Sequence, residues 1–521
     1  MFSKRVDSLS GMKAAHRCIT LPSKTSDEGA GAGIDGNPFF TAALLSMWDN
    51  IVGPRIQCEW NMFDSAWQVP EQTIEYVANH TLNGEICRTE ELAAAPGQIV
   101  ENKLYVLSDH DVLVTAFIFS CFQADQGPCV YSLCLLMPLQ HRAGYLPLHK
   151  FCEQRMKECV DRLTALYQQY TDAGAVMDEF GGEMPAFMSA VEGIYRMSLR
   201  DRLTTEGTSF DGNDSLLDVD FLRKCITSHL QTCGSSIVIG KSVLEVNKTL
   251  KTLALFLSPH ERKCSRLVDG DCPDVSYEPD LFLQGLIIDG SGNVRIPEQD
   301  ITRSRLPSSL IDLDRLTVKQ TNQLHKHDVV RQEFLEMQHM KLQRPNEHQD
   351  DGAQPSICRF HATTDRSELV NAFVQEVFQL NPLCGVREAY IDMFVRRLHR
   401  SALALIAYVQ ADPMYKAASE SVSASSGNSS GILSPTMGGG GGGIGSGVTG
   451  MAPNAFNIPP QQASARPATV RNLRSDLSLE NDADFKIILA TAEKLHSGLF
   501  TWLLGDPRLQ GERYQHEFEA L

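Results

Sequence analysis

The sequence predicts a chain that combines an α+β block, an α/β block and a helical block. Three observations support this fold class. Residues 39–170 give the order strand, strand, helix, three strands, helix, which is typical of one antiparallel sheet with helices. From residue 221 strands and helices alternate, which favours a partly parallel sheet. From residue 369 onward the apolar residues recur only at helical spacing.

In the first block, period-two alternation and β-branched or aromatic residues indicate the strands. RIQCEW is the clearest case, because Ile56, Cys58 and Trp60 fall on one face. The expected strands are 39–48, 55–60, 104–108, 112–119 and 129–137, and the expected helices are 73–84 and 148–170.

In the second and third blocks, the expected strands are short and the helices amphipathic. The expected strands are 235–240 and 281–288, and the expected helices are 221–231, 243–257, 322–341, 369–380, 387–409 and 482–505. Two segments are expected to be disordered: the lead, 1–37, and a Gly/Ser-rich insert, 417–467, whose six consecutive glycines would lose much entropy on ordering.

Composition narrows the function classes. The 521 residues, 42% hydrophobic, are enough for two or three domains. A net charge of −17 without a basic stripe argues against nucleic-acid binding. The 14 cysteines are scattered and form no C-x-x-C pair, and neither a signal-peptide core nor a membrane-spanning run is visible, so we expect a cytoplasmic protein with free thiols.

The stretch WDNIVGPRIQCEW is the most distinctive local feature. Pro54 follows Gly53 between two strand-like runs, and Asp49 and Asn50 can hydrogen-bond their own backbone in a turn. The stretch contains no histidine or nucleophile beside a base, so we interpret it as a strand–turn–strand corner. Trp48 is expected to add apolar area to a sheet face.

Two other stretches resemble known sites without matching them. GSSIVIGKS, 234–242, has five residues between its glycines where a phosphate-binding loop needs four. We expect a strand, a turn and a helix start there, with Ser242 as the N-cap. PHERKC, 259–264, lacks the second histidine of a zinc-protease helix. His260, Cys264 and Cys272 lack a fourth ligand, so no metal or cofactor is expected.

Two charged stretches are expected to face solvent. LHKHD, 324–328, is interpreted as the solvated face of a polar helix. Arg396, Arg397 and Arg400 share a helix with apolar Leu398, so they form either the wet edge of an amphipathic helix or a basic strip that faces a partner.

Several stretches together resemble one family, the longin–DENN proteins of chromosome nine open reading frame seventy-two. They are WDNIVGPR (48–55), ANHTLNGE (78–85), YLPLH (145–149), TSHLQTCG (227–234), LFLSPHERKCSRL (255–267), FLQGLI (282–287), VFQLNP (377–382) and LHRSALALI (398–406). The lead and the glycine-rich insert depart from the family pattern, which suggests a divergent, invertebrate member.

The resemblance implies a domain organisation. It assigns 38–170 to a longin domain, 171–214 to a linker with a helix, 215–345 to the α/β part of a DENN module, and 360–510 to its helical part.

The resemblance also implies a regulator of Rab or Arf GTPases in membrane traffic, autophagy and lysosome function. Its implied partners are a second longin–DENN protein, as an obligate heterodimer, and a WD-repeat protein. It implies a cytoplasmic protein recruited by partners to lysosomes, autophagosomes and endosomes, with a nuclear pool as a further expectation.

The resemblance leaves the mode of action open between nucleotide exchange and GTPase activation. An activating complex inserts an arginine that neutralises transition-state charge, and in this family that arginine is expected on the partner. No catalytic residue is therefore expected in this chain; Arg55 is a candidate because it lies at a turn, but we expect it to form an ion pair in the corner or an interface contact. The interface candidates are Trp48, Asp49, Asn50, Pro54 and Arg55. The alternatives are a pure scaffold without effect on GTP turnover, and a nucleotide- or metal-dependent enzyme using Lys241, Ser242, His260 or Cys264.

Overall fold

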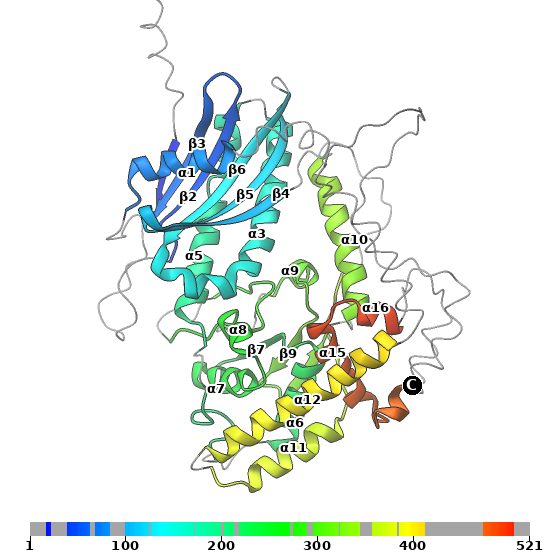
Figure 1. The fold of residues 1–521 in the computed structure, drawn as a ribbon. Helices are drawn as coiled ribbons and strands as arrows, with labels where there is room; N and C mark the ends of the chain where they lie inside the picture. The colour runs from blue at the N-terminus through cyan, green and yellow to red at the C-terminus, as the bar shows by residue number, and fades with distance from the viewer. Residues whose placement is uncertain are drawn as a thin grey trace, which may run out of the picture. The chain divides into compact units, whose positions relative to one another are not determined.

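The structure is a computed structural model. It describes residues 17–21, 39–62, 68–83, 99–123, 127–170, 172–199, 203–212, 218–270, 275–288, 294, 296–321, 324–343, 357–382, 385–411 and 473–504. The chain divides into two compact units, which Figure 1 draws in one view. Unit 1 comprises 1–201, 259–266 and 335–354, and unit 2 comprises 202–258, 267–334 and 355–521.

Unit 1 is built on one six-stranded sheet with the strand order β1-β3-β2-β6-β5-β4. Every neighbouring pair is antiparallel except β1 with β3, so the predicted antiparallel sheet is confirmed. The strands are β1 (Arg17–Leu21), β2 (Ala42–Asp49), β3 (Gly53–Met62), β4 (Ile99–Leu107), β5 (Val112–Gln123) and β6 (Gly127–Pro138).

Helices cover both faces of this sheet (Figure 1). On one face α1 (Glu71–Asn83) buries Ile74 and Val77 against alternate residues of β5 such as Val114. On the other face lies α3 (Arg142–Gln169), towards which Cys121 of β5 points its thiol. Unit 1 also contains α4 (Ala173–Phe180), α5 (Glu183–Arg196), α8 (Pro259–Lys263) and the short turns η2 (Ser108–His110) and η3 (Leu139–His141).

Two expectations for unit 1 need correction. Within the lead expected to be disordered, Arg17–Leu21 is a strand that pairs in parallel with Cys58–Met62, because β3 offers an open edge on that side. The remainder of the lead lies outside the described residues. The segment 171–214 contains two helices rather than one, α4 and α5. Trp60 is fully buried and donates from Nε1 to the carbonyl of Gly181 at 3.1 Å, so the end of α4 belongs to the packing of unit 1, whereas residues 203–212 belong to unit 2.

Unit 2 contains a five-stranded mixed sheet with the order β11-β10-β9-β7-β8. Its centre is parallel, as the alternation of strands and helices predicts, and β10 and β11 are antiparallel additions. The strands are β7 (Ser236–Gly240), β8 (Leu283–Ile287), β9 (Ser309–Asp312), β10 (Thr317–Gln320) and β11 (His361–Ala362). The short strands β9 to β11 were not predicted.

The crossover helix α7 (Val243–Ala254) packs directly on β8. The contact point is Gly285, where a Cβ would lie 2.5 Å from Val268 and 2.6 Å from Val246. The glycine is therefore required by close helix–strand packing. The other helices of unit 2 beside the sheet are α6 (Val219–Gln231), α9 (Glu298–Arg303) and the first part of α10 (Leu324–Gln343), whose residues from 335 onward are assigned to unit 1.

Four further helices lie among the described residues of unit 2: α11 (Glu368–Gln379), α12 (Val386–Ala411), α15 (Asp482–Leu495) and α16 (Leu499–Leu504). The predicted helices 369–380 and 387–409 are confirmed. The predicted helix 482–505 is divided into α15 and α16, because Gly498 adopts φ +95° between them. The insert 417–467 lies outside the described residues.

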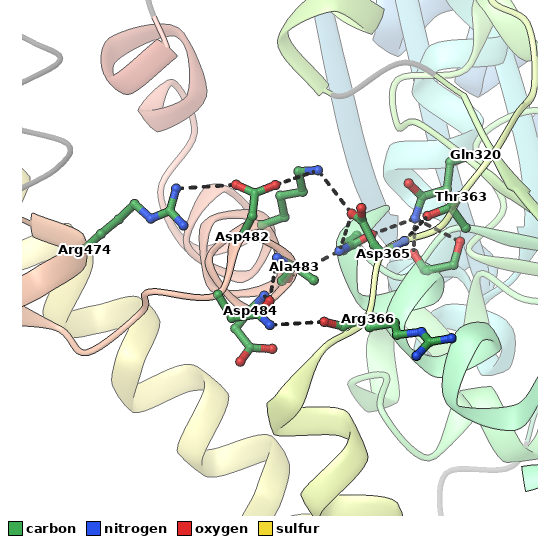
Figure 2. A network of polar contacts seen from close by, with 12 residues as sticks. Gln320, Thr363, Asp365, Arg366, Arg474, Asp482, Ala483 and Asp484 are labelled. Carbon is green, nitrogen blue, oxygen red and sulfur yellow. Dashed lines mark hydrogen bonds and ion pairs between the residues drawn. The ribbon is translucent and has the colours of Figure 1, made fainter. Parts of the chain in front are cut away.

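A network of polar contacts connects α15 with α6 and β10 in unit 2 (Figure 2). Lys486 of α15 lies between two carboxylates, 2.9 Å from Asp482 and 3.1 Å from Asp365. Asp365 also accepts from Gln231 of α6 at 3.1 Å, and Gln231 accepts from Gln320 of β10 at 2.9 Å. Burial lowers the pKa of Lys486, but the two carboxylates outweigh it and raise that pKa, so the ammonium stays charged.

The observed class is thus mixed α/β, with an antiparallel sheet in unit 1 and a partly parallel sheet in unit 2. The assignment of these units to a longin domain and a DENN module stays a prediction.

Candidate functional site

The corner formed by the end of β2, the following turn and the start of β3 contains all five predicted interface residues. Asp49 ends β2, and its Oδ1 accepts hydrogen bonds from the backbone N–H groups of Ile51 (2.8 Å) and Val52 (3.2 Å). Asn50 lies in the turn between the strands. Gly53 takes φ +90°, which favours glycine, and Pro54 pairs with Trp48 across the strands. The predicted strand–turn–strand corner is confirmed.

Arg55 is held within this corner. Its Nη1 lies 3.1 Å from Oδ2 of Asp49, and both side chains are partly exposed. The backbone hydrogen bonds from Ile51 and Val52, together with Arg55, hold the pKa of Asp49 below its usual value, so the carboxylate stays charged at neutral pH. The guanidinium is therefore part of a local ion pair, and a catalytic role for Arg55 stays untested.

The tip of the same turn is unusually apolar. Ile51 is 94% exposed and Val52 is 73% exposed. Apolar side chains at a turn tip contribute nothing to the core, and exposed apolar groups beside a charged pair are typical of protein interfaces. Trp48, beside the turn in β2, packs on the cluster of Leu82, Ile118 and Val130.

The stretch that resembles a phosphate-binding loop is a strand, a turn and a helix start. Ser236–Gly240 is the buried strand β7, and the Oγ of Ser242 caps α7 by accepting from the N–H of Glu245 at 3.4 Å. The predicted N-cap is confirmed. Because Ile237 and Ile239 are buried in the sheet core, their segment does not curl around an anion.

A cavity of about 410 Å³ does lie beyond the carboxyl ends of β7 and β9. This is the place where open α/β sheets bind ligands, since the connections that leave the two strands diverge there. Its polar lining carries both signs of charge, from Lys241 and Lys248 on one hand and Glu245 and Asp314 on the other. A lining of both signs does not select an anionic ligand such as a nucleotide.

The residues considered for metal binding differ in exposure, since His260 is exposed and Cys264 is buried. His260 lies on α8, and the Cys264 thiol donates to the carbonyl of Pro147 at 3.0 Å. Cys272 lies outside the described residues. Within the described ranges, no group of three His, Cys, Asp or Glu side chains is placed to hold a metal ion.

The expectation for LHKHD was wrong at His327, which is fully buried. Its Nε2 lies 2.6 Å from the carbonyl oxygen of Ser304, and its Nδ1 lies 3.3 Å from the Sγ of Cys358. The spacing of His327 with Val330 and Phe334, at i, i+3 and i+7, is a core-facing pattern that could have revealed this.

His327 and Cys358 do not form an activated nucleophile. Burial lowers the pKa of His327 to about 4 and raises the pKa of Cys358 to about 11. Both groups are therefore neutral at pH 7, whereas a reactive cysteine needs a lowered pKa. Sequence reasoning missed this pair, because its members are 31 residues apart and meet only in the fold.

The arginines of α12 lie on its outer surface. Arg396, Arg397 and Arg400 are exposed, while Leu398 on the opposite side is buried. This arrangement confirms an amphipathic helix. It fits both interpretations of the arginines, a solvent-exposed face and a basic strip that faces a partner. No helix among the described segments is long and apolar enough to cross a membrane.

The sequence is similar to one protein family and to several known proteins. The profile of the C9orf72-like protein family matches residues 76–327. The chain is 29% identical over 505 residues to the human protein named guanine nucleotide exchange factor C9orf72, which covers 91% of this chain and 93% of the human one. The rat and mouse homologues of that protein show the same identity and coverage. The match with the human protein runs through both compact units, so the similarity to C9orf72-like proteins is not confined to one of them.

Proposed function

We propose that this protein regulates small GTPases of the Rab or Arf type through protein–protein surfaces and contributes no reactive side chain of its own. The observation that carries the proposal is the similarity, along 91% of the chain, to proteins named guanine nucleotide exchange factors. An exchange factor needs no catalytic side chain, because it acts by binding the switch regions in a form that releases nucleotide.

The chemistry of the described residues supports the same conclusion. The Cys–His pair of unit 2 is neutral and buried, the segment that resembles a phosphate-binding loop is a strand, and Arg55 is engaged by Asp49. The apolar tip at Ile51 and Val52 instead offers a contact surface in unit 1. We propose that this turn faces a second longin–DENN protein, with which the chain forms a heterodimer joined by a WD-repeat protein.

In this proposal the complex acts in membrane traffic, autophagy and lysosome function, and partners recruit it to lysosomes, autophagosomes and endosomes. Any arginine that stabilises the transition state of GTP hydrolysis belongs to the second longin–DENN protein. Whether exchange or hydrolysis is stimulated is decided by measuring both.

The test uses a panel of Rab and Arf GTPases loaded with a fluorescent GDP analogue. Release of the analogue, and separately hydrolysis of GTP, are measured with the chain alone and with the chain plus its longin–DENN partner. Stimulation of either reaction supports the proposal. If the complex forms and neither reaction changes on any GTPase, the chain is a scaffold and the proposal is wrong.

Arg55→Ala separates docking from catalysis. The matched control is Arg196→Ala, because Arg196 also forms an ion pair in unit 1, 2.6 Å from Glu192. We expect Arg55→Ala to weaken partner binding more than Arg196→Ala while the rate at saturating complex is unchanged. A rate at saturation reduced roughly 10³-fold would instead assign Arg55 the role of an arginine finger.

A further inference from the structure

Two cysteines of unit 1 occupy directly opposed positions on neighbouring antiparallel strands. Cys121 of β5 pairs with Cys129 of β6 in the sheet register. Opposed residues of an antiparallel pair lie about 4.5–5.5 Å apart at Cα, which falls within the range of about 4.4–6.8 Å found for disulfides. Their side chains also share one face of the sheet. The backbone therefore holds two reduced cysteines at a spacing that permits a disulfide.

The surroundings of the pair agree with this proximity. Burial raises the pKa of Cys121 to about 12, and the nearby Cys129 raises it further. Burial also raises the pKa of Cys129, with a contribution from the negative charge of Asp49. The pair thus lies close to the turn that carries Asp49 and Arg55.

The two thiols differ in access. Cys121 is fully buried, and its thiol donates to the carbonyl of Thr164 on α3 at 3.8 Å. Cys129 is only partly buried, so a solvent-borne reagent can reach it first. An accessible cysteine followed by a shielded neighbour is the arrangement in which the second thiol resolves a mixed disulfide.

From this geometry we infer that Cys121 and Cys129 form a reversible cross-strand disulfide on reaction with small disulfides of the glutathione class. The Cys129 thiolate attacks one sulfur of the reagent, a mixed disulfide forms, and one reagent thiolate leaves. The Cys121 thiolate then attacks the Sγ of Cys129 and displaces the second reagent thiolate. Two protein thiols are oxidised to one disulfide, one reagent disulfide is reduced to two thiols, and the two thiol protons pass to the leaving thiolates.

The disulfide between Cys121 and Cys129 is easily reduced. Opposed Cβ atoms lie about 4.5–5.5 Å apart in a sheet, whereas disulfides prefer about 3.5–4.5 Å, so closing the bond draws the strands together. A strained disulfide has a more oxidising potential and is reduced readily. The raised pKa values of both thiols make exchange slow at neutral pH, because only the thiolate reacts. The site therefore responds to sustained oxidation and returns to two thiols in a reducing buffer.

The test incubates the full-length protein in buffers of fixed ratios of reduced to oxidised glutathione until composition no longer changes. Remaining thiols are alkylated, and peptides are mapped by mass spectrometry without reduction. We expect a peptide linked through Cys121 and Cys129 in the oxidising buffers and its loss after transfer to the reducing buffer. Alkylation of both residues after complete equilibration in the most oxidising buffer would overturn the inference, as would a link that persists in the reducing buffer.

A second close pair in unit 1 provides a matched control. Cys264 is near enough to raise the pKa of Cys152 together with burial, but both cysteines are buried. We expect Cys152 and Cys264 to stay thiols under the conditions that oxidise Cys129. The conservative variant Cys129→Ser removes the link without deleting a fully buried group, and it should leave Cys121 reduced. If Cys121 in this variant formed the same amount of disulfide with another residue, the register pairing would not be the cause.

Discussion

Replacing Gly285 by alanine tests the packing that defines unit 2. The new methyl carbon would lie 2.5 Å from Cγ2 of Val268, 2.6 Å from Cγ1 of Val246 and 3.0 Å from Cδ1 of Leu250. Ordinary carbon contacts lie at about 3.5–4.0 Å, so the two valines must move by about 1 Å and Leu250 by about 0.5 Å. The first two contacts involve β-branched valines, which have few alternative rotamers.

The expected cost follows from these contacts. Overpacking a well-filled core costs about 1–3 kcal/mol, and alanine returns about 0.4–1 kcal/mol by restricting the unfolded chain. We therefore expect a net loss of about 1–2 kcal/mol. For a urea m-value of about 2 kcal/mol/M, this lowers the unfolding midpoint of unit 2 by about 0.5–1 M.

The assay is urea unfolding followed by circular dichroism, with hydrogen exchange of peptides from β7, β8 and α7 to assign the loss to unit 2. Gly270→Ala is the matched control, because a Cβ there meets nothing within 4 Å. Equal stability of Gly285→Ala and Gly270→Ala would show that α7 does not approach β8 as closely as the structure has it, and the account of the parallel core would be wrong.

Further predictions concern local stability and pH. Gly193→Ala, in the interior of α5 with open space around its Cβ, should stabilise unit 1 by about 0.5–1 kcal/mol in thermal unfolding, and a loss would contradict the helix. Asn481→Ala removes a cap that accepts from the N–H groups of Ala483 and Asp484, and should cost about 1–2 kcal/mol. Ser242→Ala removes one longer bond, 3.4 Å, and should cost less; the reverse order in urea unfolding would refute the capping geometry. Buried His327 has a pKa of about 4, below the unfolded value of about 6.5, so the unfolded chain binds more protons between these values and stability falls as the pH decreases through them. The stability of the wild-type chain relative to His327→Gln should therefore decrease by about 2 kcal/mol from pH 7 to pH 5; a difference that does not change with pH would show that His327 is not held neutral.

Much of the fold follows from local sequence patterns. The central strands of unit 1 are runs of apolar and β-branched residues, because helices cover both faces of the sheet, and the amphipathic helices of unit 2 show their buried side by spacing. Ser242 could be recognised as a cap because capping depends only on nearby residues.

The parts that could not be predicted depend on distant partners. SLID and TVKQ form strands of four residues each, too short to show periodicity. They pair with each other, and SLID also pairs with β7. Arg17–Leu21 becomes a strand because β3 presents an edge. His327 is buried because Cys358 and Ser304, far away in sequence, provide its partners.

The candidate site was predicted in position but not in detail. The turn residues Asp49, Asn50 and Pro54 indicate the corner from sequence, because their preferences are local. The Asp49–Arg55 ion pair and the exposed tip at Ile51 and Val52 require knowledge of the strand register. The opposition of Cys121 and Cys129 likewise depends on the register of β5 and β6.

In the proposed function, this chain influences GTP turnover by docking and not by chemistry of its own. The most direct measurement is the rate of labelled GDP release from each GTPase as the concentration of the intact complex increases. We expect, for at least one Rab or Arf protein, a release rate that rises and saturates, and that keeps its plateau when Arg55, Lys241 or Cys358 is replaced singly. A reaction that the chain performs alone, and that one such replacement abolishes, would contradict it.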